Sequence, residues 1–164
     1  MRCPSGTADK CFYAKHVWKG ADSSLELVEV GEGQPIVAIR DLRGLIALVQ
    51  SSVLEIYPWG SKIKNLDLPD RLTIDFDPGK SLPWQSVIAA AQEVRDRLKL
   101  HRLESYVKTT GGKGMHVVVP LKLKATWEIA KAFCQSLVKA MVYDSPDKYV
   151  SAMTKSRWKG RIFY

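Results

Sequence analysis

Residues 71–77 alternate strictly between apolar and polar side chains, and this short stretch constrains the fold more than any other. Successive side chains of a β-strand point to opposite faces of its sheet, so the alternation predicts a strand with one buried face. The apolar face would consist of Leu72, Ile74 and Phe76, and the polar face of Thr73, Asp75 and Asp77. The turn signal Pro78-Gly79 ends the strand. Such a strand would be a rigid core element that holds its polar side chains in place.

Asp75 and Asp77 would project from the same face at the end of this strand, about 7 Å apart along the backbone. Two negative charges this close repel each other unless a cation lies between them. Hard divalent ions such as Mg²⁺ and Mn²⁺ prefer oxygen ligands, and the phosphates of a nucleotide can complete the coordination sphere. The pair therefore suits metal-dependent phosphoryl transfer. The alternative is a solvated strand end with two acidic side chains.

A glycine-rich segment, residues 108–116, supplies a second set of candidate residues. Its three glycines allow the backbone to approach a ligand closely and to present N–H groups to phosphate oxygens. Thr110 adds a hydroxyl, Lys113 a positive charge, and His116 a further donor at the start of the next predicted strand. The spacing differs from that of a Walker motif. The alternative is a tight hairpin with a surface lysine.

The rest of the chain predicts strands and helices that are mixed without strict alternation, and so an α+β fold. Strands are expected over residues 25–30, 35–39, 53–57, 106–108 and 115–119, and the first two would form a hairpin. Helices are expected from Asp41 to about residue 51, from Pro83 to about residue 98, and in a long last segment capped by Thr126. The length of 164 residues fits a single domain over residues 1–164.

The charge of the chain favours a polyanionic partner. Lys and Arg total 25 against 17 Asp and Glu, which gives a formal net charge of +8. Such an excess suits nucleic acid or nucleotides, and a solvated basic surface is an equal alternative. Basic residues cluster near the end of the second predicted helix and around Trp158: Arg95, Arg97, Lys99 and Arg102, then Lys155, Arg157, Lys159 and Arg161.

No apolar stretch is long enough to span a bilayer, and the first residues contain no apolar export signal. A cytoplasmic protein without membrane contact is therefore expected. The chain has three cysteines, Cys3, Cys11 and Cys134, whose odd number and wide spacing give neither a disulfide framework nor a short zinc knuckle. We therefore expect reduced thiols.

Together, the segments Leu72–Gly79 and Val107–Pro120 resemble the polymerase domain of bacterial DNA ligase D, a member of the archaeo-eukaryotic primase superfamily. Further similar segments are Arg2-Cys3-Pro4, Cys11-Phe12 with Lys15-His16, Ile39–Leu42 and Gly160–Phe163. The resemblance covers nearly the whole chain. It implies a primase-polymerase-like fold in which a mixed or antiparallel sheet is flanked by helices.

The resemblance implies catalytic, metal-binding carboxylates at Asp75 and Asp77, with Mn²⁺ or Mg²⁺ as the metal. It also implies a set of nucleotide-binding residues: Tyr57, Thr110, Lys113, His116 and Arg161. The implied reaction is attack of a primer 3′-hydroxyl on the α-phosphate of a nucleotide, with release of pyrophosphate, in DNA repair by non-homologous end joining. The implied partners are DNA, nucleoside triphosphates, Ku, and a ligase domain or separate ligase. When bound to DNA, such a protein would be associated with the nucleoid.

The sequence departs from the family pattern in three ways. Tyr57 occupies a position that normally carries a histidine close to the nucleotide. The family has a third metal carboxylate just after the segment Arg161–Phe163, where this sequence ends. The sequence also begins where the family domain is already under way. An incomplete domain, truncated at both ends, is therefore expected.

Three hypotheses on function follow from these features. The first is an active nucleotidyltransferase of the DNA polymerase or primase type. The second is a catalytically inactive remnant that binds nucleic acid or nucleotides without the third carboxylate. The third is a split subunit that a second polypeptide completes. Metal-dependent turnover distinguishes the first from the second, and co-purification of another chain favours the third.

Overall fold

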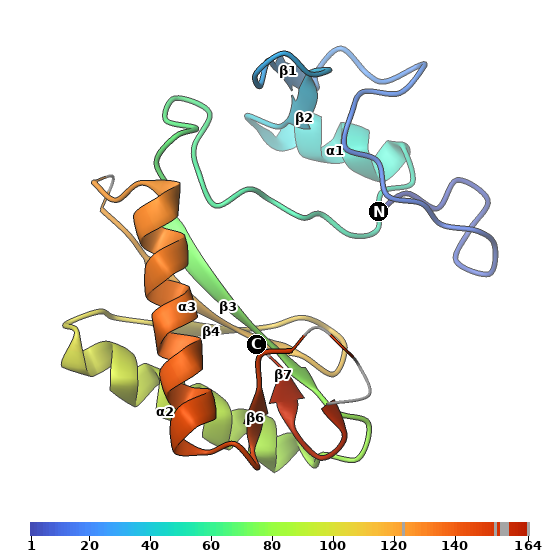
Figure 1. Cartoon of the computed structure of the whole chain (residues 1–164). Helices are drawn as coiled ribbons and strands as arrows, with labels where there is room; N and C mark the ends of the chain where they lie inside the picture. Colours follow the sequence, from blue (N-terminus) through green and yellow to red (C-terminus); the bar gives the residue numbers. More distant parts are fainter. Residues whose placement is uncertain (123, 153, 155–157, 164) are drawn as a thin grey trace. The chain divides into compact units, whose positions relative to one another are not determined.

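The computed structural model describes residues 1–122, 124–152, 154 and 158–163 (Figure 1). The chain divides into two compact units, Met1–Pro58 and Trp59–Tyr164. Each unit has its own sheet and its own hydrophobic cluster. The assignment of residues 1–164 to a single domain stays a prediction.

The first unit contains a two-stranded sheet and one helix. β1 (Glu26–Val28) pairs antiparallel with β2 (Ile36–Ala38), which confirms the predicted hairpin. α1 (Leu42–Gln50) follows Asp41, whose carboxylate accepts hydrogen bonds from two backbone N–H groups of the first turn. This cap satisfies donors that a helix start otherwise leaves unpaired, and it confirms the predicted start of the helix.

The N-terminal segment Met1–Cys3 lies between two other segments of the first unit. Arg2 exchanges backbone hydrogen bonds with Phe12 at N···O distances of 2.9 and 3.0 Å. On the other side, backbone hydrogen bonds tie the segment to residues 52–54. Pairing there is limited to one isolated bridge, so the strand predicted over residues 53–57 is wrong.

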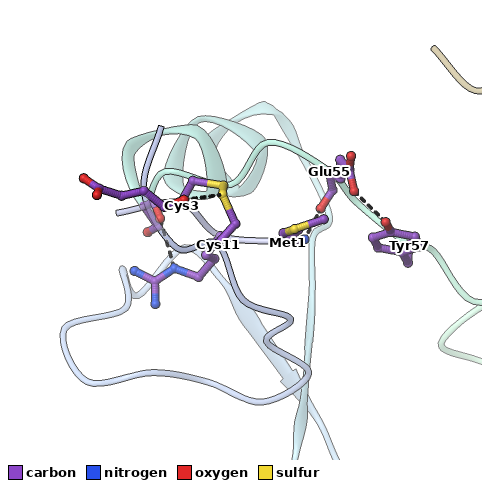
Figure 2. Close-up of a disulfide and its surroundings, with 8 residues drawn as sticks. Met1, Cys3, Cys11, Glu55 and Tyr57 are labelled. Atoms are coloured by element: carbon purple, nitrogen blue, oxygen red, sulfur yellow. Dashed lines mark hydrogen bonds between the residues drawn. A yellow bond between two sulfur atoms is a disulfide. The ribbon is translucent and has the colours of Figure 1, made fainter. Parts of the chain in front are cut away.

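A disulfide joins Cys3 to Cys11, with Cα atoms 4.4 Å apart (Figure 2). The expectation of reduced thiols is therefore wrong for this pair, whereas Cys134 is a free cysteine. Arg2 pairs antiparallel with Phe12, and the next opposed residues in such a pair are the two cysteines. Spacing along the sequence carries no information about this pairing, because the pairing arises from the way the chain start folds back.

The second unit is built on a mixed five-stranded sheet. Its strands are β3 (Arg71–Pro78), β4 (Tyr106–Thr109), β5 (Met115–Pro120), β6 (Tyr149–Val150) and β7 (Ile162–Phe163). The strand order is β4-β5-β3-β7-β6, and only β6 and β7 pair in parallel. The mixed sheet and its helices confirm the α+β class that the sequence predicts. The central strand is the one with the strict alternation.

Two helices, α2 (Trp84–Leu100) and α3 (Trp127–Asp144), cover one face of this sheet (Figure 1). One hydrophobic cluster contains the apolar residues of β3 and β5 together with residues of both helices. Phe76 of β3 and Met141 of α3 have no exposed surface. The apolar side chains of β3 therefore point into the core, and its polar side chains lie on the opposite face of the sheet.

Both helices begin where the sequence predicts. α2 follows Pro83, and α3 follows Thr126, whose hydroxyl accepts a hydrogen bond from the first turn of the helix. Most of the predicted apolar stripe of α2 is buried, from Val87 to Leu98, whereas Ile88 is partly buried and Trp84 is 44% exposed. In the part of the chain that the structure describes, no helix is both long and apolar enough to cross a membrane.

The turn that follows β3 has room only for glycine. The Gly79 N–H donates to the Arg161 carbonyl oxygen at 3.0 Å, and a Cβ at Gly79 would lie 2.2 Å from the Trp158 carbonyl oxygen. We expect Gly79→Ala to displace the segment that leads into β7 and to lower the free energy of unfolding by about 1–3 kcal/mol. Denaturant unfolding of the two proteins measures this loss.

Gly112→Ala is the matched control for this substitution. A Cβ added at Gly112 meets no atom within 4 Å, so the control tests the cost of losing a glycine without a close contact. Equal stability of the two variants would contradict the close approach at Gly79.

Candidate functional site

The polar face of β3 presents two carboxylates on either side of a buried phenylalanine. Asp75 and Asp77 are exposed, whereas Phe76 between them has no exposed surface. Because successive side chains of a strand point in opposite directions, the burial of Phe76 orients both carboxylates away from the core. The two residues predicted to be catalytic therefore share one face, as the alternation implies.

A row of three polar side chains crosses the neighbouring strands at this point. Asp75 of β3 is paired in register with His116 of β5, and His116 with Lys108 of β4. The imidazole Nε2 of His116 lies 3.3 Å from the Asp75 carboxylate Oδ1. Residues paired in register share a face of the sheet, so Lys108 belongs to the same row. Sequence reasoning missed Lys108. The side chains of Lys108 and His116 can be assigned to the same face of the sheet only when the register of the hairpin is known.

The other ring nitrogen of His116, Nδ1, is buried. Among the described residues no group lies within hydrogen-bonding distance of this atom, and the side chain as a whole is 22% exposed. A buried polar atom without a partner is unfavourable. A water molecule or ligand group that reaches this atom would therefore be bound favourably.

The loop between β4 and β5 folds onto the end of β3. Within it, the Thr110 hydroxyl donates to the Gly114 carbonyl oxygen at 3.0 Å, and Lys113 is exposed. A Cβ at Gly114 would lie 3.0 Å from the Phe76 carbonyl oxygen and 3.7 Å from the Asp75 Oδ1, so this close approach favours glycine. The structure thus brings the glycine-rich segment to the end of the strand that carries the two carboxylates.

Arg161 lies directly before β7 and is engaged within the second unit. Its carbonyl accepts the hydrogen bond from Gly79, and its guanidinium Nη1 donates to the Pro146 carbonyl oxygen at 3.4 Å. Trp158 lies in the same segment and stacks on Phe163, with ring centroids 4.3 Å apart. The structure therefore uses both side chains for contacts within the fold, and the nucleotide-binding role of Arg161 stays a prediction.

Two of the four residues in the basic cluster near the end of α2 are paired with acidic side chains. Arg95 contacts Asp96 at 2.9 Å. Arg97 contacts both Glu93 and Asp144 at 2.8 Å. These ion pairs reduce the positive charge that the helix offers to a polyanion. Two members of the predicted C-terminal cluster, Lys155 and Arg157, lie outside the described residues.

Tyr57 belongs to the first unit, where it contacts two neighbours. Its hydroxyl donates to the Glu55 carboxylate Oε2 at 2.5 Å (Figure 2). The edge of its ring meets the ring of Tyr13, with centroids 5.5 Å apart. The hydrogen bond to Glu55 raises the pKa of the Tyr57 phenol, because ionisation would remove the shared proton. The place of Tyr57 in a nucleotide-binding site stays a prediction.

The electrostatics of the carboxylate pair favour a cation. Partial desolvation against the strand end raises the pKa of Asp75, although 58% of its side chain is exposed. His116 opposes this shift, and the neighbouring carboxylate of Asp77 adds to it. Both carboxylates offer the oxygen donors that Mg²⁺ and Mn²⁺ prefer, so the pair fits a hard divalent ion. In the described part of the chain, no three His, Cys, Asp or Glu side chains are placed to hold a metal together. Water or substrate oxygens would therefore have to complete the coordination sphere.

The raised pKa of Asp75 has a consequence for the metal-free protein. The folded state holds the Asp75 proton more tightly than the unfolded chain, so this group stabilises the fold below its ordinary pKa and loses that contribution as pH rises through the folded-state pKa. At neutral pH we therefore expect Asp75→Asn to raise the thermal midpoint by no more than about 2 °C in the presence of a chelator, because solvent screens a carboxylate that is partly exposed. At a pH low enough to protonate Asp75, this gain should disappear.

Asp67→Asn is the control, because Asp67 is exposed in a turn of the same unit and its substitution changes the net charge equally. Thermal midpoints of the three proteins across the acidic range check the expectation. A midpoint for Asp75→Asn below that of the wild type at neutral pH would show that ionised Asp75 stabilises the fold.

Comparison with known proteins relates these features to a family. Residues 1–164 match the sequence profile described as LigD, primase-polymerase domain. The multifunctional non-homologous end joining protein LigD of Pseudomonas aeruginosa is 30% identical over 99% of this chain, which spans 20% of that protein. LigD of Mycolicibacterium smegmatis is 28% identical over 99% of this chain, which spans 22% of that protein.

A solved structure gives the same assignment. The polymerase domain from Mycobacterium tuberculosis ligase D, in complex with DNA, matches with a TM-score of 0.87 and 26% sequence identity. The match covers 99% of this chain and 60% of that chain. The profile match over the whole chain and the shared fold agree, and metal dependence is a general property of this family. The chain belongs to the LigD primase-polymerase domain family.

Proposed function

We propose that the chain catalyses metal-dependent nucleotidyl transfer as a DNA repair polymerase domain in non-homologous end joining. The observation that carries the proposal is the juxtaposition at the end of β3. There the Asp75 carboxylate lies 3.3 Å from His116, and the glycine-rich loop approaches the same strand end. Carboxylates that suit a metal thus stand beside donors that suit a triphosphate.

The proposed substrates are a nucleoside triphosphate and a DNA primer terminus. The relative of known structure from M. tuberculosis is a polymerase domain in complex with DNA, which supports DNA as the partner of this chain. The formal net charge of +8 agrees with a polyanionic substrate. In the reaction, the primer 3′-oxygen forms a bond to the α-phosphorus as the bond to pyrophosphate breaks.

Each residue at the strand end has a proposed role. Asp75 and Asp77 would hold Mn²⁺ or Mg²⁺, which would offset the negative charge of the phosphates and orient the reacting groups. His116, whose side chain lies beside Asp75 and is 22% exposed, would bind a phosphate oxygen. Lys113 is exposed in the loop and would add a positive charge. The Thr110 hydroxyl donates to the Gly114 carbonyl oxygen and would turn from it to donate to the triphosphate.

The proposed setting is repair of broken DNA ends. The relatives from P. aeruginosa and M. smegmatis carry the name multifunctional non-homologous end joining protein, and this chain spans about a fifth of their length, 20% and 22%. We therefore also propose a ligase domain, or a separate ligase, and Ku as partners. Tyr57 and Arg161 are proposed members of the nucleotide site.

Primer extension tests the proposal. The purified chain is incubated with gapped template–primer DNA, Mn²⁺ and labelled ribonucleotides, and in parallel with deoxyribonucleotides. We expect extension by the wild type and a loss of at least about a hundredfold for Asp75→Ala/Asp77→Ala, because that variant lacks the charge needed at the metal. Asp67→Ala removes an exposed carboxylate of the same unit and should retain activity.

A different outcome favours the inactive remnant. If no extension occurs but DNA binding persists in the Asp75→Ala/Asp77→Ala variant and weakens steeply with salt, the chain is a basic binding module. Extension that appears only when a second polypeptide is added supports the split subunit instead.

The Thr110 hydroxyl provides a narrower test of the triphosphate site. Thr110→Ser keeps the hydroxyl and should leave the KM for the nucleotide close to that of the wild type. Thr110→Val keeps the shape but removes the donor, and we expect it to raise that KM about tenfold, the loss of one hydrogen bond. Steady-state kinetics that separate KM from kcat check this, and an unchanged KM for Thr110→Val would place the hydroxyl away from the nucleotide.

A further inference from the structure

The first unit carries a disulfide that the proposed polymerase chemistry does not use. It closes a loop over residues 4–10, all of which are exposed. Cys3 is 5% exposed, whereas Cys11 is partly exposed at the end of the loop. The Cys11 side of the bond is therefore the more accessible to a thiol from solvent.

The chain segment that follows Cys11 contains a residue that contacts Tyr57. Phe12 follows Cys11 and holds its place through the two backbone hydrogen bonds with Arg2. Tyr13 comes next, and its ring meets the edge of the Tyr57 ring. One residue, Phe12, therefore separates the disulfide from a side chain in contact with Tyr57.

The chain segment that precedes Cys3 contacts Glu55, which in turn contacts the same tyrosine. The N-terminal ammonium of Met1, two residues before Cys3, donates to the Glu55 carbonyl oxygen at 2.5 Å (Figure 2). The carboxylate of Glu55 accepts the hydrogen bond from the Tyr57 hydroxyl. Of the two neighbours of Tyr57, Tyr13 thus follows one cysteine closely in the chain, and Glu55 is contacted by the segment that precedes the other.

We propose that the pair Cys3–Cys11 is a thiol–disulfide exchange site whose reduction loosens the contacts that hold Tyr57. The reactant is a dithiol reductant, either a small molecule or a protein with two neighbouring thiols. The surroundings of the bond separate it from a purely structural disulfide. Its loop is wholly exposed and one cysteine is partly exposed. The backbone pairing between the two flanking segments is short, with two hydrogen bonds between Arg2 and Phe12.

The exchange proceeds in two balanced steps. A thiolate of the reductant attacks the Cys11 sulfur, so that a mixed disulfide forms while the Cys3–Cys11 bond breaks. Cys3 leaves as a thiolate and takes up a proton. The second thiol of the reductant then attacks the mixed disulfide and releases Cys11. The reductant ends as its own disulfide, and two electrons have passed to the cysteine pair.

Reduction acts on the local structure through chain entropy. The disulfide restricts the conformations open to the loop 4–10 and to both flanking segments. Without it, the hydrogen bonds between Arg2 and Phe12 must hold two short segments together, and such pairing opens readily. Tyr13 then loses its fixed position against Tyr57. An effect on nucleotide binding rests on the proposed function, since the role of Tyr57 there is itself a proposal.

Thiol counting is the first test. The whole chain is equilibrated in buffers of increasing ratio of reduced to oxidised dithiothreitol, alkylated and analysed by peptide mass spectrometry. We expect one alkylated cysteine, Cys134, under oxidising conditions and reversible labelling of Cys3 and Cys11 under reducing conditions. Three labelled cysteines in oxidising buffer, or a pair that stays unlabelled in reducing buffer under native conditions, would overturn the proposal.

Structural readouts follow the same titration without any nucleotide. On reduction, we expect trypsin cleavage after Lys10 to accelerate on the order of tenfold, and the Phe12 and Leu54 amides to exchange hydrogen faster by a similar factor. Peptides from β5 in the second unit are the internal control and should not change. Cleavage and exchange rates that are equal in the two redox states would overturn the proposal.

Two variants keep these outcomes interpretable. Cys3→Ser/Cys11→Ser should behave like the reduced wild type in every redox buffer, whereas Cys134→Ser should keep the full redox response. Neither readout requires polymerase activity, so a failure of primer extension leaves this test intact. Where extension is observed, reduction should raise the KM for the nucleotide several-fold in the wild type and not in Cys3→Ser/Cys11→Ser.

Discussion

The burial of Phe76 is the interaction on which the second unit depends. This side chain has no exposed surface and lies in the cluster that joins β3 and β5 to both helices. Burying a phenylalanine stabilises a fold by about 1.5–3 kcal/mol, and on a strand it also determines where the two neighbouring side chains point. Asp75 and Asp77 therefore cannot turn inward without exposing Phe76. Core packing thus maintains two like charges close together on the opposite face of the sheet.

Two glycines allow other segments to approach the end of this strand. Gly114 admits the loop between β4 and β5, and Gly79 admits the segment that leads into β7. In both places a Cβ would meet a backbone oxygen at 3.0 Å or less. The strand end is therefore crowded with backbone, and the Asp75 carboxylate lies within reach of this backbone as well as of Asp77. This arrangement explains why burial and a neighbouring charge together raise the pKa of Asp75.

Much of this site was predictable, for reasons that are local. The alternation over residues 71–77 and the glycines of residues 108–116 require only neighbouring positions to be read. The register that pairs Asp75 of β3 with His116 of β5 brings these two segments together at one end of the sheet. The short strands β6 and β7 were not predicted. Each has only two residues, too few for a periodic pattern.

By itself, the sequence determined the α+β class, the shared face of Asp75 and Asp77, and the family, because periodicity and motifs are properties of neighbouring residues. Only the tertiary structure decided that Cys3 is bonded to Cys11, that Lys108 joins the row of His116, and that the arginines of α2 are paired with acids. Each of these contacts depends on which segments lie opposite one another. Strand register and the places where the chain reverses direction determine which segments lie opposite one another. The spacing of residues along the sequence does not reveal this.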